Sequence, residues 1–442
     1  MPLVCAQPVY VRYREAVGGA LLHRVNLGAK YLDDYRSIIR RELYEEIQDL
    51  ADRLRGVRVL NINATSFGGG VAEILYTIVP LMRDVGVASE WAVMLGAEPF
   101  FNVTKNFHNA LQGADYELTT EARAIYEEYN RQSAQALLDS GEEWDLVFVH
   151  DPQPALMRHF SRKLAPESAL ASRSRWIWRC HIDTSTPNEE LFTYLAPHIN
   201  SHDAQVYTMR DYTPPGVNED ALAIIPPAID PLAPKNMALS GIDSEYVVRQ
   251  FGVDTARPFL LQVSRFDPWK DPLGVIDVYR QVKEDNPAVQ LVLIGSMAHD
   301  DPEGWDYWYK TVEYADEDPD IHLFTNLTNV GAIEVNAFQS LAAVVIQKSI
   351  REGFGLVVTE ALWKARPTVA GRVGGIPMQI TSGGGALVDD VSEAADACSK
   401  NLADPEYARK MGLRGKEHVR ESYLTPRLMR DELHLFAKLL GV

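Results

Sequence analysis

The segment REGFGLVVTEAL (351–362) decides how the second half of the chain folds, because it places a glycine turn between two different hydrophobic patterns. Before it, the apolar run AAVVIQ (342–347) has the length and β-branched content of a buried strand. After the turn, the sequence continues with the apolar spacing of a helix. Glycines let the backbone turn sharply and approach a ligand closely at the positive end of that helix. The segment therefore predicts a strand, a tight turn and a helix.

Strand-like runs of the same kind recur along the chain, each beside a helical stretch. They are VRVLNIN (57–63), EWAVML (90–95), DLVFVH (145–150), WIWRCHI (176–182) and LAIIPP (222–227) in the first half, and FLLQVS (259–264), VQLVLIG (289–295), IHLFT (321–325), AAVVIQ (342–347) and PTVAG (367–371) in the second. This alternation predicts an α/β protein with two Rossmann-like domains, each a doubly wound parallel sheet covered by helices. Ligands of such sheets bind at the carboxyl ends of the strands, so we expect the two domains to face a central cleft.

A proline-rich segment, PPAIDPLAPKNMALSG (226–241), lies between the two series and lacks apolar periodicity. We place the boundary near Ala238, which predicts an N-terminal domain over 1–238 and a C-terminal domain over 239–424. The segment 425–442 begins with an N-cap threonine and a proline, and has an apolar face. It predicts a C-terminal helix that could pack back on the N-terminal domain.

Composition and charge limit the partners of the chain. With 442 residues, 46% of them hydrophobic, it can bury two cores, and its net charge of -18 repels nucleic acid and anionic membrane surfaces. Its cysteines, Cys5, Cys180 and Cys398, show no paired spacing, and neither a signal-peptide core nor a membrane-spanning run occurs. We therefore expect a cytoplasmic protein with small-molecule partners, no nucleic acid and no membrane. A homodimer is compatible with these features.

The turn after 342–347 carries two glutamates. Glu352 precedes Gly353-Phe354-Gly355, and Glu360 follows after seven intervening residues, on the first turns of the helix. The unpaired N–H groups at the start of that helix would point at a bound phosphate. Gly374-Gly375 precedes another predicted helix in the same way. This combination predicts an anionic ligand close to both glutamates.

Two cations follow the first strand of the same half. The stretch FLLQVSRFDPWKDP (259–272) places Arg265 and Lys270 in the loop at the carboxyl edge of the sheet, beside Trp269. A guanidinium fork and an ammonium group there can neutralise a diphosphate. Solvated surface charge is the simpler alternative for both residues.

Three turns in the first half also follow strands. Gly68, Gly69 and Gly70 precede a helix, where their backbone N–H groups could approach a ligand. A flexible turn would also explain these glycines. Their spacing matches neither a dinucleotide fingerprint nor a P-loop. His150 ends a strand, where it would face the cleft or only hydrogen-bond its own turn. His181, Asp183 and Asn188 form a second polar cluster, which offers the donors and acceptors that suit a neutral sugar.

Together these motifs resemble the retaining GT-B glycosyltransferases of the glycogen-synthase and sucrose-synthase clan. More closely, the chain is similar to the trehalose glycosyltransferring synthases, which join the glucose of a nucleotide sugar to free glucose. The stretches that carry this resemblance span nearly the whole chain. They are SFGGGVAEIL (66–75), FFNVTKNFHNALQG (100–113), VHDPQP (149–154), WRCHID (178–183), QVSRFDPWKD (262–271), MAHDDPEGW (297–305) and IREGFGLVVTEALWK (350–364).

The resemblance implies roles for individual residues. The C-terminal domain would bind UDP-, ADP- or GDP-glucose, and the N-terminal domain would bind the acceptor. Glu360 would hold the ribose hydroxyls and Glu352 the hydroxyls of the donor sugar, which His150 would also touch. Arg265 and Lys270 would hold the diphosphate. The helix start at Gly355-Leu356-Val357 would cradle the distal phosphate, and Gly353, Phe354, Gly69 and Gly70 would also bind the nucleotide sugar. The expected product is trehalose, in a reversible reaction.

No cofactor and no metal is expected, because fixed cations and backbone donors can stabilise a departing diphosphate. No Asp-x-Asp pair follows a strand, and Asp300-Asp301 predicts a helix cap. Alternatives remain within and outside this class. They are a transferase that makes a glycosylglycerate or another soluble glucoside, one that uses a sugar phosphate, a noncatalytic sugar-nucleotide sensor, and a nicotinamide oxidoreductase, whose fingerprint is missing.

Overall fold

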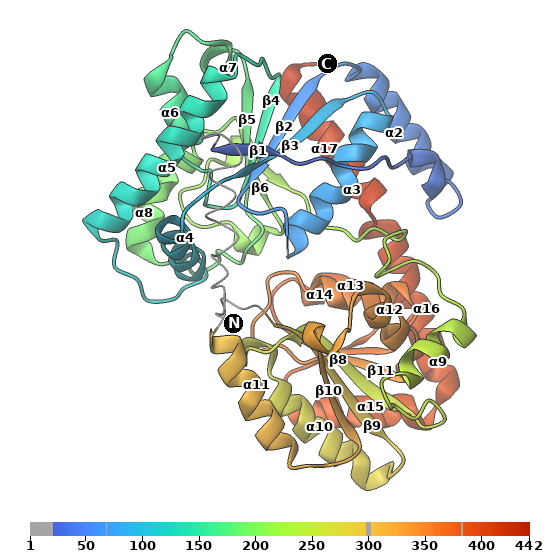
Figure 1. The fold of residues 1–442 in the computed structure, drawn as a ribbon. Helices are drawn as coiled ribbons and strands as arrows, with labels where there is room; N and C mark the ends of the chain where they lie inside the picture. The colour runs from blue at the N-terminus through green and yellow to red at the C-terminus, as the bar shows by residue number, and fades with distance from the viewer. Residues whose placement is uncertain (1–20, 68, 298–301, 382) are drawn as a thin grey trace, which may run out of the picture. The chain divides into compact units, whose positions relative to one another are not determined.

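The computed structural model describes residues 21–67, 69–297, 302–381 and 383–442 (Figure 1). It divides into two compact units. Unit 1 comprises Met1–Asp34, Glu45–Ile225 and Met429–Val442, and unit 2 comprises Tyr35–Tyr44 and Pro226–Leu428. Each unit is therefore built from stretches that are far apart in the sequence.

Within the described residues, unit 1 contains a seven-stranded sheet with the order β1-β3-β2-β4-β5-β6-β7. The edge strand β1 pairs with β3 in antiparallel fashion, and the other neighbours are parallel. The strands are β1 Leu22–Arg24, β2 Arg58–Asn63, β3 Ala88–Met94, β4 Leu146–His150, β5 Arg175–Arg179, β6 Ala204–Tyr207 and β7 Leu222–Ile224. The predicted strands of the first half all lie in this sheet, and β1 and β6 are additional.

Helices cover the sheet of unit 1. They are α2 Arg41–Arg53, which begins in unit 2, α3 Gly70–Asp84, α4 Glu98–Leu111, α5 Thr120–Asp139, α6 Met157–Leu164, α7 Ala169–Ser172, α8 Glu189–Ile199 and most of α17 Thr425–Leu440. Short 3-10 turns lie at η1 Leu32–Tyr35, η2 Arg210–Tyr212 and η3 Glu219–Ala221.

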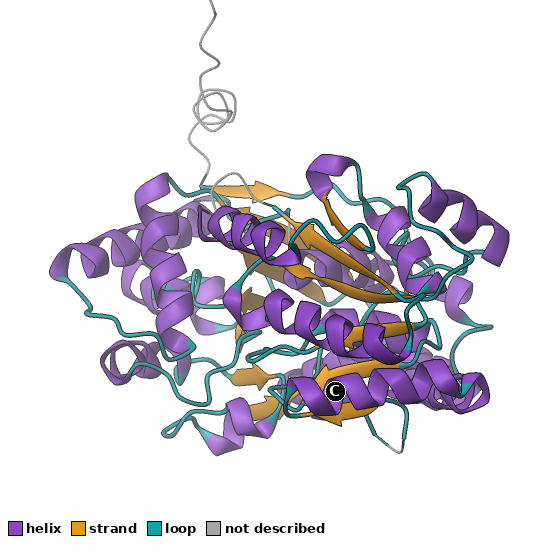
Figure 2. Cartoon of the chain, turned by 90° about the horizontal axis from the view of Figure 1, so that it is seen from below, coloured by secondary structure: helices purple, strands orange, loops and turns teal. Residues whose placement is uncertain are grey.

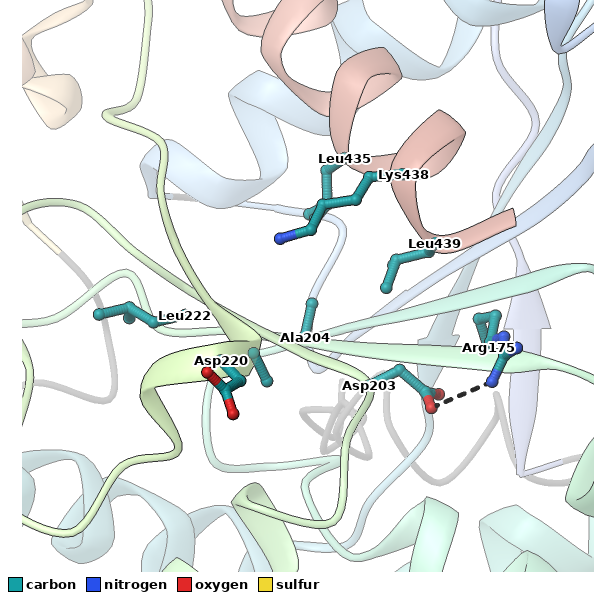
Figure 3. Close-up of a pocket in the computed structure, with 9 residues that line it drawn as sticks. Arg175, Asp203, Ala204, Asp220, Leu222, Leu435, Lys438 and Leu439 are labelled. Atoms are coloured by element: carbon teal, nitrogen blue, oxygen red, sulfur yellow. Dashed lines mark ion pairs between the residues drawn. The ribbon is translucent and has the colours of Figure 1, made fainter. Parts of the chain in front are cut away.

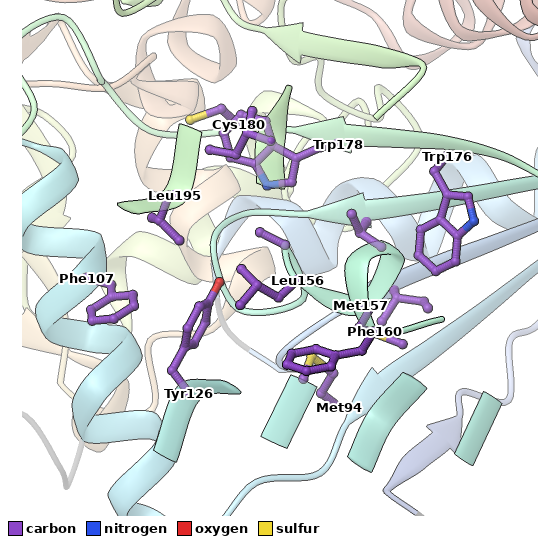
Figure 4. Close-up of a cluster of buried hydrophobic side chains, with 14 of the residues drawn as sticks. Met94, Phe107, Tyr126, Leu156, Met157, Phe160, Trp176, Trp178, Cys180 and Leu195 are labelled. Carbon is purple, nitrogen blue, oxygen red and sulfur yellow. The ribbon is translucent and has the colours of Figure 1, made fainter. Parts of the chain in front are cut away.

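Side chains alternate between the two faces of the unit 1 sheet. On one face, Val147, Val149, Trp176 and Trp178 join a large apolar cluster with residues of α4, α5, α6 and α8, as Figure 4 shows around Trp178. On the opposite face, the Phe148 ring meets Phe436 of α17 edge-on at 6.1 Å between centroids. His150 and Arg179 point to this second face because they follow the same alternation, so the polar groups at the strand ends lie on the side of α17.

Unit 2 contains a six-stranded parallel sheet in its described residues, with the order β10-β9-β8-β11-β12-β13. The strands are β8 Phe259–Arg265, β9 Gln290–Ser296, β10 Ile321–Thr325, β11 Val344–Gln347, β12 Thr368–Gly371 and β13 Ala386–Val388. Five of them match predicted runs, and β13 is additional. Apolar clusters on both faces of this sheet explain the continuous apolar character of its strands.

The helices of unit 2 lie on both sides of its strands, and Figure 2 shows strands lying between helices. They are α9 Gly241–Arg249, α10 Pro272–Asp285, α11 Pro302–Ala315, α12 Ala332–Leu341, α13 Leu356–Trp363, α14 Ile376–Gln379, α15 Val391–Ala403 and α16 Pro405–Ser422, with 3-10 turns η4 Pro268–Lys270 and η5 Asn326–Thr328. The predicted cap at Asp300-Asp301 lies outside the described residues.

The division between the units falls at Ile225 and Pro226, whereas the sequence placed it near Ala238. Hydrogen bonds tie the proline-rich segment to unit 2. Asn336 of α12 donates to the carbonyls of Pro234 and Met237, and the indole of Trp363 donates to that of Asn236. The segment 226–238 thus has fixed partners, which its lack of apolar periodicity did not reveal.

The expected C-terminal helix is present as α17. Its residues from Met429 onward belong to unit 1, where the side chains of Leu433 and Phe436 are buried. None of the helices in the described part of the chain combines the length and apolar character needed to cross a membrane.

Candidate active site

Two histidines lie together at the carboxyl edge of the unit 1 sheet. His150 is the last residue of β4 and pairs with Arg179, the last residue of β5, so His181 follows just beyond the sheet. The Nδ1 atom of His150 lies 3.0 Å from Nε2 of His181, and the two rings stack. His150 is almost fully buried, at 2% exposure. The structure therefore brings together two residues that the sequence placed on separate turns.

The histidines are held in their neutral form. Burial, with a smaller contribution from the charge of Arg179, keeps the pKa of His150 well below its ordinary value. The pKa of His181 is lowered by burial first, then by Arg179 and by His150. Neutral imidazoles present one donor and one acceptor each, which suits hydrogen bonds to sugar hydroxyl groups.

Arg179 does not extend toward the turns beyond the sheet. Its guanidinium donates to Glu432 Oε1 of α17 at 2.7 Å and to the carbonyl of Ile225 at 3.1 Å. Both side chains of this ion pair are buried, at 2% and 5% exposure. The guanidinium of Arg179 therefore lies between the sheet and α17, and from there its positive charge lowers the pKa of both histidines.

Asp151 joins this group although it was not among the predicted site residues. Its backbone has a left-handed φ of 64°, which is uncommon for a residue other than glycine. Its Oδ1 atom accepts a hydrogen bond of 2.9 Å from the backbone N–H of His181. Burial raises the pKa of Asp151 to about 6, against the opposing effects of that N–H group and of Arg179. A strained carboxyl group with a raised pKa beside two histidines is typical of a functional site.

Asp183 and Asn188, predicted to bind the acceptor, have local partners. Oδ1 of Asp183 accepts from the N–H and hydroxyl groups of Ser185, at 2.9 and 2.6 Å. Asn188 caps helix α8 by accepting from the N–H of Leu191, and its amide donates to the carbonyl of Tyr116. Both side chains therefore have a structural task at these turns, and their contact with an acceptor stays a prediction.

The glycine turn of unit 1 leads from β2 into α3. Gly69 has a φ of 82° and is the N-cap of the helix, which begins at Gly70, while Gly68 lies outside the described residues. The turn is anchored from the strand, because Asn63 donates to the carbonyl of Thr65 at 2.7 Å and Thr65 in turn bonds the backbone of Phe67. Among the described residues no side chain caps the positive end of α3, an environment that favours an anion or a hydroxyl group.

In unit 2, an ion pair joins the two motifs that the sequence singled out. Strands β8 and β11 are neighbours, so the residues that follow them meet at one edge. Lys270, in η4, places its Nζ atom 2.6 Å from Oε2 of Glu352, and the hydroxyl of Ser349 donates to the same oxygen at 3.2 Å. Arg265 lies nearby in sequence but is 65% exposed, and it pairs with Asp267 at 3.2 Å. Lys270 is therefore fixed, whereas Arg265 extends into solvent.

The turn Gly353-Phe354-Gly355 has the conformation that the sequence predicts. Gly355 is the N-cap of α13 with a φ of 82°, and a side chain there would lie 3.1 Å from Cγ of Glu352. The N–H of Gly375 donates to the carbonyl of Gly353 at 2.9 Å, which joins the two glycine turns. Phe354 is buried, whereas Leu356 and Val357 are half-buried. The N–H groups at the start of α13 thus lie directly beside the Lys270 and Glu352 pair.

Glu360 is more deeply placed than a surface ligand. It is 2% exposed, its Oε1 atom lies 3.5 Å from Lys235 Nζ, and its Oε2 accepts from Gln339 at 3.3 Å. Lys364, one turn further on, donates to the backbone carbonyl of Glu360. Burial lowers the pKa of Lys364 to about 8, although the charge of Glu360 opposes that shift. Lys235 and Gln339 hold the carboxylate of Glu360, and sequence analysis assigned neither of them a role.

A cavity of about 250 Å³ lies elsewhere in unit 1, at the amino ends of β5, β6 and β7 (Figure 3). Arg175 and Asp203 form an ion pair of 3.6 Å on one side of it, and Leu435, Lys438 and Leu439 of α17 line another side. Because ligands of parallel sheets bind at the carboxyl edge, we do not assign the candidate site to this cavity.

Each unit carries its own polar groups at the carboxyl edge of its sheet. Unit 2 has the fixed Lys270 beside a helix start, and unit 1 has the two neutral histidines. No group of three or more histidine, cysteine or carboxylate side chains suited to a metal ion occurs in the part of the chain that the structure describes. Of the cysteines, Cys180 and Cys398 are buried free thiols, and Cys5 lies outside the described residues.

Comparison with known proteins gives consistent matches over both units. Residues 61–214 match the family model described as trehalose synthase, N-terminal domain, and residues 243–418 match that of glycosyl transferases group 1. A trehalose synthase of Rubrobacter xylanophilus is 76% identical over 422 residues, which cover 96% of this chain and 100% of that protein. A trehalose synthase of Thermococcus litoralis is 47% identical over 408 residues, covering 92% and 96%.

The fold is also shared with a solved structure. An α,α-trehalose-phosphate synthase (UDP-forming) from Burkholderia xenovorans, in complex with glucose-6-phosphate, has a TM-score of 0.68 at 15% identity. The match covers 88% of this chain and 100% of that one. At this identity the likeness speaks for the fold alone, which is the two-domain GT-B fold expected from the sequence.

Proposed function

Because this chain belongs to the trehalose synthase family of GT-B glycosyltransferases, we propose that it transfers glucose from a nucleoside diphosphate glucose to free glucose. The transfer retains the anomeric configuration of the donor and forms α,α-1,1-linked trehalose. Trehalose-related glycosyl transfer follows from the family, and the substrates and stereochemistry are what we propose beyond it.

The ion pair of Lys270 and Glu352 at the start of α13 carries the proposal. When the bond between C1 of the glucosyl group and the diphosphate breaks, its electron pair stays on the phosphate oxygen. Lys270 and the first N–H groups of α13 can stabilise that charge without rearranging, because the fold already fixes them. The carboxylate of Glu352 anchors Lys270 and leaves acceptor capacity for hydroxyl groups of the donor sugar.

The acceptor supplies the new bond. Its anomeric hydroxyl attacks C1 on the face that the diphosphate leaves, and its proton passes to the departing phosphate oxygen. The family resemblance assigns His150 to the donor sugar. In the structure its ring is buried and both ring nitrogens are hydrogen-bonded, to Asn61 and to His181, so we propose that it stays neutral and acts through His181.

The groups at the carboxyl edge of unit 1 favour a neutral acceptor. A sugar phosphate or glycerate would need fixed cations. Arg179, the cation nearest to the two histidine turns in sequence, is occupied by Glu432 inside unit 1. His181, the partly exposed member of the neutral histidine pair, instead matches a hydroxyl group of free glucose.

A competition experiment tests the proposal. Glucose, glucose 6-phosphate and glycerate are offered together with UDP-, ADP- or GDP-glucose, and the products are identified by NMR, which also gives the anomeric configuration. We expect trehalose from free glucose, with α configuration at both anomeric carbons. Preferential use of the phosphorylated or carboxylated acceptor would replace the substrate assignment, and a β linkage would contradict retention.

Hydrolysis and binding controls separate an enzyme from a sensor. A protein that binds the nucleotide sugar in calorimetry, yet releases no nucleoside diphosphate with any acceptor, would be a noncatalytic sensor. Glu352→Gln serves as the matched control, since it keeps the size of the side chain and removes one carboxylate charge from the proposed site, with circular dichroism to check its folding.

A further inference from the structure

Asn61 is a buried polar residue in the middle of β2, a central strand where apolar side chains are favoured. It points to the same face of the sheet as His150. Its Oδ1 atom lies 3.3 Å from Nε2 of His150, and its amide nitrogen lies 3.2 Å from both the carbonyl of Glu90 and the hydroxyl of Ser89. At 5% exposure, this side chain is fixed by partners on two neighbouring strands.

These contacts determine where the proton of His150 lies. The carbonyl of Glu90 can only accept, so the side-chain nitrogen of Asn61 must face it, and Oδ1 must face His150. An amide oxygen cannot donate, so the hydrogen bond requires a proton on Nε2 of His150. A neutral ring with that proton has a bare Nδ1 atom, which can only accept.

The same logic continues to the second histidine. Since Nδ1 of His150 is an acceptor, Nε2 of His181, 3.0 Å away, must donate. The remaining nitrogen of His181, Nδ1, is then a bare acceptor. Among the described residues, no group forms a hydrogen bond with it, and His181 is partly exposed at the edge of the sheet.

We propose that Asn61 is a positioning residue, which fixes the proton of His150 on Nε2 and so makes Nδ1 of His181 an acceptor for a sugar hydroxyl group. This inference rests on the proposed function only for the nature of the ligand. The neutral state of both rings, which burial and Arg179 favour, is compatible with it. Asn61 touches no substrate in this account, and it acts through the two histidines.

The test measures the tautomers directly in the full chain without substrate. Histidine is labelled with ¹⁵N, and two-bond proton–nitrogen spectra are recorded near pH 7.5, with the two signals assigned by their loss in His150→Gln and His181→Gln. In the wild type we expect both rings neutral and protonated on Nε2. A proton on Nδ1 of either ring would overturn the proposal.

Asn61→Leu removes the acceptor while keeping a similar volume. His150 should then move its proton to Nδ1 and donate to His181, whose own proton moves to Nδ1. The kcat/KM for free glucose should fall about tenfold to a hundredfold, the loss typical when the hydrogen-bond partner of a metal-binding histidine is removed. Binding of the nucleoside diphosphate, measured by calorimetry, should not change. Asn61→Val repeats the test if Asn61→Leu does not fold, because valine suits a central strand.

Ser89→Ala is the matched control. It removes the contact of Ser89 with the nitrogen of Asn61 and leaves the contact with His150 in place. Tautomers and kcat/KM should stay as in the wild type. Unchanged tautomers in Asn61→Leu, or changed tautomers with normal kcat/KM, would refute the positioning role. A wild-type protein without transferase activity would refute the proposed function while leaving the tautomer result valid.

Discussion

Lys270 Nζ lies 2.6 Å from Glu352 Oε2, so the cation that follows β8 and the glutamate that precedes α13 form one ion pair rather than two separate sites. Strand β11, which leads to Glu352, is the direct neighbour of β8. The pair is nearly buried, at 16% and 10% exposure of the two side chains. Effects of mutation at Lys270 should therefore exceed those at the exposed Arg265.

Lys270→Ala and Arg265→Ala should both lower turnover, because each removes positive charge near the proposed leaving group. A preorganised donor contributes about 2 to 4 kcal/mol to the transition state, so we expect a loss of two to three orders of magnitude for Lys270. Arg265 must first be ordered, and its loss should be smaller. Steady-state kinetics with circular dichroism as a folding check measures this. Arg249→Ala, at an exposed pair on α9, should leave turnover intact.

Glu352→Gln and Glu360→Gln should reduce activity in different ways. Glu352 lies at the Lys270 contact, so its loss should depress turnover while nucleoside diphosphate still binds. Glu360 is the fifth residue of α13 and lies beside Lys235, so its loss should mainly weaken nucleotide binding. Calorimetry with UDP, ADP and GDP, paired with kinetics, separates the two. The opposite pattern would reverse the two assignments.

Asp151→Asn should stabilise the protein at neutral pH. The pKa of Asp151 is raised from 3.8 to about 6, so the folded state binds more protons than the unfolded state between these values. The contribution of Asp151 to the free energy of unfolding is therefore fully present below about pH 4 and is lost as the pH rises through 6. Asparagine tolerates the left-handed backbone and still accepts from His181. We expect a gain of about 1 to 3 kcal/mol at pH 7 and little gain at pH 4, measured by urea unfolding.

Glu432→Leu should destabilise unit 1, because it leaves the buried guanidinium of Arg179 without its carboxylate. Removing one partner of a buried pair costs about 3 to 5 kcal/mol. The double variant Arg179→Met with Glu432→Leu should recover most of that loss. Arg173 and Glu143 form a pair at the same 2.7 Å distance, at 70% and 67% exposure, so Glu143→Leu should cost less than about 1 kcal/mol. Equal losses at both pairs would contradict the role of burial.

Activity should persist in excess EDTA. In the proposed mechanism, Lys270, Arg265 and the start of α13 offset the charge of the departing diphosphate, so no divalent cation is needed for that purpose. The rate is measured before and after chelation, with magnesium or manganese added back. Loss of activity that these ions restore would contradict the prediction.

The sequence predicted most strands of both sheets, and the exceptions have physical reasons. β1, β6 and β13 are short and lie among polar or glycine residues, whereas β7 and β11, which are equally short, lie in the longer apolar runs LAIIPP and AAVVIQ. The residues Ala204 and Gln205 of β6 also have low strand preference. Such strands form because neighbouring strands already provide their hydrogen-bonding partners, and that information is not local.

The candidate site was predictable in its residue types but not in its contacts. Glycines and charges after strands indicated Lys270, Glu352 and the turn at Gly355. Asn61 escaped notice because it lies inside an apolar run, although a buried amide in a central strand needs partners and is itself a signal. The partner of Arg179, Glu432, is separated from it by most of the chain, and only the fold brings the two together.

The non-contiguous composition of unit 1 has a consequence for synthesis. Its stretch Glu45–Ile225 leaves the ribosome long before Met429–Val442, because all of Pro226–Leu428 is translated in between. Until then, Phe148 and Arg179 lack their contacts with Phe436 and Glu432 of α17. The nascent unit 1 thus has one face of its sheet incomplete, and a ribosome-bound chain stalled before α17 should be far more sensitive to protease than the released full chain.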